Sequence, residues 1–175
     1  TNFLGFSAVQ VGWVLSFYGF GSLAGVFLGG KLADKVGYYK LMYFSLLATG
    51  LVFFSLQFIT EFYTLCLGIF TLTLVADTFR PSVWVALDDY SLPENRTRSV
   101  TLIRLAINLG FSAGPALGGL LIMFLSYRSL FWVDGITCVI AGLIIIIFLK
   151  QKTRVKNKSE RDQAVKASPY KDANY

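Results

Sequence analysis

Long apolar runs alternate with short charged segments along this 175-residue chain. Residues 1–30 and 41–60 contain no charged side chain, and three later runs of similar length contain only one or two each. About 20 residues of helix cross the roughly 30 Å hydrocarbon core of a bilayer, and runs of this length favour helices over the strands of a membrane barrel. The pattern therefore predicts an all-α membrane protein with transmembrane helices at approximately 8–30, 41–60, 63–87, 99–125 and 129–149.

The charged residues between and after these runs predict an orientation. The segment 31–40 contains three lysines, the segment 88–98 contains two arginines, and residues 150–171 contain eight of the sixteen basic residues. The other two connections contain one basic residue between them, Arg128. Because basic connections stay in the cytoplasm, we expect an external amino terminus, a cytoplasmic carboxyl terminus and a basic cytoplasmic tail at 151–175.

Composition argues against several other classes of protein. Hydrophobic residues make up 55% of the chain and charged residues only 15%, against about 25% in a typical soluble domain. The net charge of +6 comes from the connections and the tail, so the apolar body has no basic face for nucleic acid. The chain has no histidine, and its two cysteines lie inside apolar runs. We therefore expect no metal site, no cofactor, no nucleic-acid partner and no enzymatic activity.

The first charged segment reads Gly-Lys-Leu-Ala-Asp-Lys-Val-Gly-Tyr-Tyr-Lys, from Gly30 to Lys40. It resembles the G-x-L-x-D-[RK]-x-G-[RK]-[RK] motif between the second and third helices of the major facilitator superfamily. The matching residues are Gly30, Leu32, Asp34, Lys35 and Gly37. Tyr38 and Tyr39 replace the basic pair, and Lys40 supplies a cation one residue later. The resemblance implies a cytoplasmic gating turn in which Asp34 acts as a latch near Asp89, which is similar to the acidic residue that ends the family's fourth helix.

Two of the predicted helices carry small residues at every fourth position. In the first these are Gly21, Gly25 and Gly29; in the fourth they are Ala106, Gly110, Gly114 and Gly118. Such a stripe lets another helix approach closely, either as plain packing or as a sliding contact. The segment Gly110-Phe-Ser-Ala-Gly114-Pro115-Ala-Leu-Gly118-Gly119 also resembles the G-x-x-x-G-P-x-x-G-G motif of the superfamily's proton-coupled antiporters. We expect Pro115 to kink this helix.

The resemblance implies that the five helices are helices two to six of a six-plus-six bundle, with the tail starting the central linker. The first helix and the second half would then be missing from this chain; a natural five-span protein is the alternative. The implied function is secondary transport of a small solute across the cell membrane by alternating access, with proton-coupled export favoured. An importer and a membrane scaffold without transport remain alternatives. The exporters' arginine early in the fourth helix is absent, since Gly68 and Ile69 occupy that region.

Ionisable residues inside the apolar runs are candidate functional groups because charge at membrane depth is costly. Asp77 and Arg80 are three residues apart on one predicted helix and so share a face. Arg104 and Asn108 share a face of the next one, away from its glycine stripe. These four residues are candidates for a solute cavity or a proton relay, or else form a neutralised structural cluster. For Asp134 we expect an ion pair with Arg128.

Overall fold

The computed structural model describes residues 7–149, which contain only helices and no strand. The helical segments are α1 (Ala8–Val36), α2 (Tyr38–Leu56), α3 (Phe62–Asp77), α4 (Phe79–Tyr90), the 3₁₀ turn η1 (Pro93–Asn95), α5 (Arg96–Phe124) and α6 (Tyr127–Phe148). Since α3 and α4 form one span, five helices in this range are long and apolar enough to cross a membrane. The predicted all-α fold with five spans is confirmed, and the tail expected at 151–175 lies outside the described residues.

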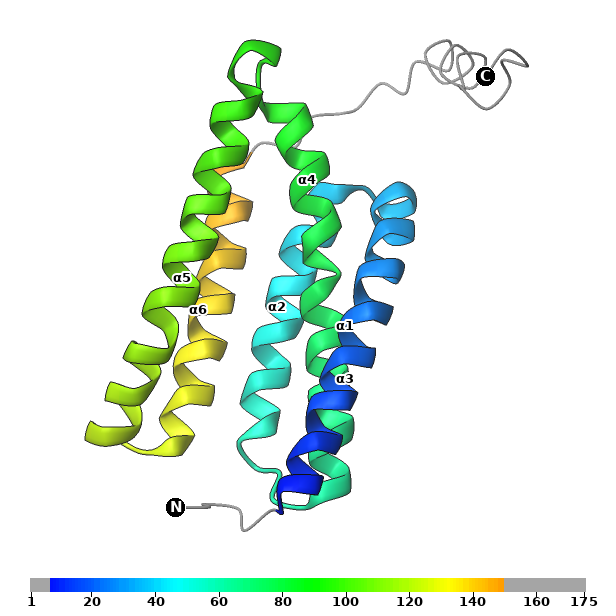
Figure 1. Cartoon of the computed structure of the whole chain (residues 1–175). Helices are drawn as coiled ribbons and strands as arrows, with labels where there is room; N and C mark the ends of the chain where they lie inside the picture. Colours follow the sequence, from blue (N-terminus) through cyan, green and yellow to red (C-terminus); the bar gives the residue numbers. More distant parts are fainter. Residues whose placement is uncertain (1–6, 150–175) are drawn as a thin grey trace, which may run out of the picture.

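The spans run alternately in opposite directions along the bundle (Figure 1). One end, here called the Gly37 end, contains the α1–α2 connection, η1 and the last turn of α6. The opposite end, here called the Glu61 end, contains the α2–α3 connection and the link between α5 and α6. The connections that carry most of the basic charge therefore lie together at the Gly37 end.

The charged segment 31–40 is helical at every residue except Gly37, which corrects the turn expected there. Helix α1 continues to Val36, and α2 begins at Tyr38. Lysine, leucine and alanine all favour helix, so the helix outlasts the apolar run that predicted it. It ends where Gly37 adopts a φ of 93°, a conformation that glycine reaches at little steric cost. Hydropathy thus located the apolar part of the helix, and not where the helix ends.

The third span is interrupted at Thr78, between α3 and α4. Pro81 accounts for the interruption, because a proline has no N–H to donate to the carbonyl four residues earlier and its ring crowds that carbonyl. The carbonyl affected is that of Asp77, the last residue of α3. The Thr78 hydroxyl donates a hydrogen bond to the carbonyl of Val75 at 2.7 Å. The span expected at 63–87 is therefore found at Phe62–Tyr90, with a local interruption beside Asp77.

The glycine stripe of α1 packs closely against α3 and against Thr78. Gly21, Gly25 and Gly29 are the buried residues of α1. A Cβ atom added at Gly21 would lie 2.5 Å from the carbonyl oxygen of Phe70, and one at Gly29 would lie 2.7 Å from the Cα of Thr78. The first glycine stripe is therefore a close helix contact, as the sequence predicted.

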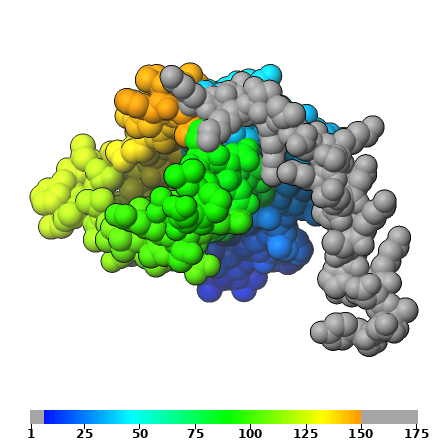
Figure 2. Space-filling model, turned by 90° about the horizontal axis from the view of Figure 1, so that it is seen from above, coloured from blue at the N-terminus to red at the C-terminus, as the bar shows by residue number. Residues whose placement is uncertain are grey.

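Helix α5 lies at the margin of the bundle beside α6 and is the most exposed helix (Figure 2). None of its residues is buried. A Cβ atom added at Gly110, Gly114 or Gly119 would meet no atom within 4 Å, and one at Gly118 would meet only Leu130, at 3.6 Å. Within the described residues, the second glycine stripe thus has no close partner. Helix α5 continues through Pro115 from Arg96 to Phe124.

Candidate functional site

Asp77 is the most deeply buried ionisable side chain of the predicted candidates. Its side chain is only 9% exposed. One carboxylate oxygen, Oδ2, accepts a hydrogen bond from the hydroxyl of Ser22 on α1. The other, Oδ1, lies 2.6 Å from Nε of Arg80 on α4. Three helical segments therefore meet at this carboxylate, each supplying one of the interacting groups.

The local structure explains why Asp77 and Arg80 can pair. They are three residues apart, as neighbours on a helix surface are, even though Thr78 separates α3 from α4. Ser22 reaches Asp77 because α1 approaches α3 closely along its glycines, and Gly25 lies on the same face one turn away. The break in the span thus lies directly beside the buried carboxylate.

Arg80 lies in different surroundings from its partner. Its side chain is 60% exposed, and it lines a cavity between α4 and α5. The two members of the ion pair therefore differ in burial. The carboxylate is buried where α1 meets α3, and the guanidinium lies on the side of the cavity between α4 and α5. Separating the pair would therefore strand the buried anion more than the exposed cation.

Arg104 and Asn108 are not brought to this site. Both are exposed on α5, and neither forms a hydrogen bond or an ion pair with Asp77 or Arg80. The four candidates expected to form one cluster thus divide into a joined pair and two separate residues. The ion pair expected between Arg128 and Asp134 is likewise not formed within 4 Å.

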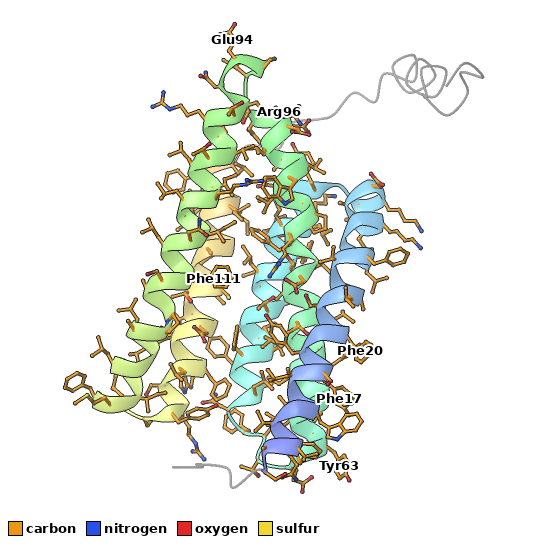
Figure 3. The ribbon with its side chains drawn as sticks, viewed as in Figure 1. Phe17, Phe20, Tyr63, Glu94, Arg96 and Phe111 are labelled. Atoms are coloured by element: carbon orange, nitrogen blue, oxygen red, sulfur yellow. The ribbon has the colours of Figure 1, made fainter. Side chains whose placement is uncertain are left out.

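The residues of the predicted gating motif gather at the Gly37 end without pairing with one another. Asp34, Lys35 and Lys40 are all exposed and form no ion pair within the described residues. Leu32 is 38% exposed, and Gly30 faces open space. An ion pair at this end joins Asp88 to Arg96 at 2.6 Å and links α4 to the start of α5; Figure 3 labels Arg96.

Tyr38, one of the two tyrosines that replace the motif's basic pair, is buried against α4. It is 6% exposed and packs with Met42 and Ala86. Its ring makes an edge-to-face contact with Tyr90, with 6.4 Å between the ring centroids. The hydroxyl also lies near enough to Asp89 to interact with that carboxylate. The apolar surroundings explain why an aromatic residue is tolerated where the motif has a cation.

Ser22 and the helix break at Thr78 were not among the predicted features. Pro81 was a signal for the break, since a proline within a helical pattern predicts an interruption just before it. Ser22 had a weaker signal, as a polar residue on the glycine face of an uncharged run. Its contact with Asp77 joins residues 55 positions apart, and the sequence does not predict which helices meet.

The chain matches the sequence model of the Major Facilitator Superfamily over residues 1–173. The match includes all of the described helices and both motifs noted above. It confirms the superfamily suggested by the resemblance at Gly30–Lys40.

Proposed function

The chain belongs to the major facilitator superfamily, a family of secondary transporters, and we propose that it takes part in proton-coupled export of a small solute by alternating access. In this proposal the amino terminus is external, the Gly37 end is cytoplasmic and the membrane is the cell membrane. The described helices are helices two to six of the first half of a larger bundle. The exposed glycine stripe of α5 supports a contact with a further part of the transporter.

The observation that carries the proposal is the buried carboxylate of Asp77. Ionised side chains within membrane helices are rare and mark proton relays or solute pathways. Asp77 lies at a helix break, contacts α1 through Ser22 and has an exposed cation as its other partner. A helix movement that separates the carboxylate from either partner leaves its charge poorly compensated inside the bundle, which is costly. Such a group can couple proton movement to a conformational change.

Export is favoured over import because α5 carries the motif associated with antiporters. Gly110, Gly114, Pro115, Gly118 and Gly119 all match that motif. The open space beside three of these glycines allows a second helix to lie close and to slide along α5. A moving contact there would let α5 shift relative to the pair at Asp77 and Arg80.

The test is a transport assay with the full-length protein in liposomes that contain a trapped pH dye. Small solutes are added singly, and those that induce a proton flux are identified and radiolabelled. We expect Asp77→Asn to abolish the proton flux and proton-driven accumulation while counterflow of the same solute down its own gradient continues. The asparagine retains an oxygen that can accept the Ser22 hydrogen bond, and Arg80 lines the cavity between α4 and α5 and is not packed in the core, so the variant should fold.

Two further variants make this result decisive. Asp88→Asn removes an acid from the exposed pair with Arg96 and should leave proton coupling unchanged. The double variant Asp77→Asn/Arg80→Gln removes both charges of the candidate site. Proton-driven accumulation by the double variant would rule out coupling at Asp77 and leave the pair a structural role.

A further inference from the structure

A cavity of about 370 Å³ lies between α4 and α5, next to the ion pair of Asp77 and Arg80. Its lining comes from both helices and is made of Phe79, Arg80, Val83, Trp84, Ile103, Ile107 and Phe111. Three of these side chains are aromatic, three are aliphatic, and Arg80 is the charged one. Figure 3 labels Phe111, on the middle of α5. The volume of the cavity is near the lower end of the roughly 300–1,000 Å³ typical of small-molecule sites.

Arg80 enters this cavity with most of its hydrogen-bonding capacity unused. A guanidinium has five N–H donors, of which the ion pair with Asp77 engages the one on Nε. The structure gives its terminal nitrogens no ion pair with any described residue. A guanidinium matches the geometry of a carboxylate and can bind it through two parallel hydrogen bonds. The unused donors therefore favour an anionic group within an otherwise apolar and aromatic cavity.

We propose that this cavity binds an aromatic carboxylate, with the carboxylate on Arg80 and the ring against Trp84 and Phe111. The inference rests on the proposed transport function and names the class of its solute. The apolar lining supplies burial for one or two fused rings, and aromatic pairs contribute about 0.5–1.5 kcal/mol beyond that burial. Asp77 holds Arg80 in place through Nε, which leaves the cation available to the ligand.

A second cavity has an aromatic lining without a charged residue. It has a volume of about 500 Å³ and is lined by Trp13, Phe17, Phe62, Tyr63, Cys66 and Leu67. Phe17 and Tyr63 lie on α1 and α3 towards the Glu61 end (Figure 3). This cavity is larger and has four aromatic lining residues against three in the first, but none of its lining residues is charged. It lacks the group that would select an anion and so provides a matched control.

The test is equilibrium dialysis of radiolabelled naphthoate against the purified full-length protein in nanodiscs of phosphatidylcholine. Naphthylmethylammonium, which has a similar ring system and the opposite charge, is the control ligand. We expect saturable binding of naphthoate and at least about tenfold weaker binding of the cation. Equal affinity for the two ligands would overturn the proposal.

Variants then assign the binding to this cavity. Arg80→Lys keeps the charge but loses the planar fork, and Trp84→Leu removes a ring; each should weaken naphthoate binding by about tenfold or more. Phe17→Ala, in the second cavity, should leave binding unchanged. Unchanged binding in both Arg80→Lys and Trp84→Leu would place the ligand elsewhere and refute the proposal.

Two comparisons separate this proposal from other outcomes. If phosphatidylglycerol in the nanodisc displaces naphthoate, the cavity is a site for an anionic lipid headgroup and the solute proposal is wrong. Naphthoate binding without any transport would contradict the proposed function but not the site. Proton-coupled movement of other solutes without naphthoate binding would contradict the site and leave the function standing.

Discussion

Individual polar side chains in this bundle have sharply different surroundings. Asp77 is buried and engaged through both oxygens, whereas its partner Arg80 is mostly exposed. Asp34, which the gating motif singles out, is exposed and without an ion pair in the part of the chain that the structure describes. Neutralising a buried, paired acid affects the stability of the fold more than neutralising an exposed acid does. A substitution at the exposed Asp34 can therefore test a role in function with little effect on folding.

Asp34→Asn tests the latch role implied by the motif. We expect the variant to fold as stably as the parent, since exposed substitutions of this kind usually change stability by less than about 0.5 kcal/mol. Solute exchange by the full-length protein should nevertheless fall strongly while equilibrium solute binding survives. Glu61→Gln, at an exposed acid of the opposite end, is the control. Transport at the native rate by Asp34→Asn would remove the latch role.

At the scale of helices, the two glycine stripes differ in what surrounds them. The glycines of α1 pack against α3 and Thr78, whereas most of the glycines of α5 have no neighbouring helix within contact distance among the described residues. The first fixes the distance between two helices and brings Ser22 to Asp77. The second, with Pro115 among its residues, remains a candidate for a moving contact.

A pair of glycine-to-alanine variants on α1 tests this difference in packing. A Cβ atom at Gly25 would come up against the backbone of Leu74, whereas one at Gly30 would meet nothing within 4 Å. We expect Gly25→Ala to destabilise the protein by about 1–3 kcal/mol, as overpacking typically does. Gly30→Ala should be neutral or stabilising by up to about 1 kcal/mol, because alanine favours a helix. Thermal unfolding in detergent measures both, and equal stability of the two variants would contradict the α1–α3 contact.

At the scale of the whole molecule, the spans form a bundle whose outer surface is apolar. Large hydrophobic side chains such as Leu15, Phe20 and Phe27 are exposed on α1, and Figure 3 shows Phe20 pointing away from the bundle. A soluble protein rarely exposes so much contiguous apolar surface. In a membrane protein the same surface faces lipid, which agrees with the family and with the five membrane-length helices.

The proposed topology predicts that the two ends of the bundle lie on opposite sides of the membrane. Single cysteines at Lys35 and Glu61, both exposed, are introduced after Cys66 and Cys138 have been changed to alanine. In intact cells, an impermeant thiol reagent should label the cysteine at position 61 and reach the one at position 35 only after the membrane is opened. Labelling of both from outside would contradict the topology.

The sequence by itself determined the features that depend on composition and on neighbours along the chain. Apolar run length identified five spans, because a bilayer requires a fixed length of helix. Spacing along one span predicted that Asp77 and Arg80 share a face, and the motif residues from Gly30 to Lys40 identified the family.

Only the tertiary structure decided the features that depend on which helices meet. It joined Ser22 to Asp77, packed the glycines of α1 while leaving those of α5 open, and kept Arg104 apart from the buried pair. Both stripes have the same spacing, and both helices carry polar residues. Such local patterns show that a face can be packed or paired, but the contact itself depends on a neighbour that is distant in the sequence.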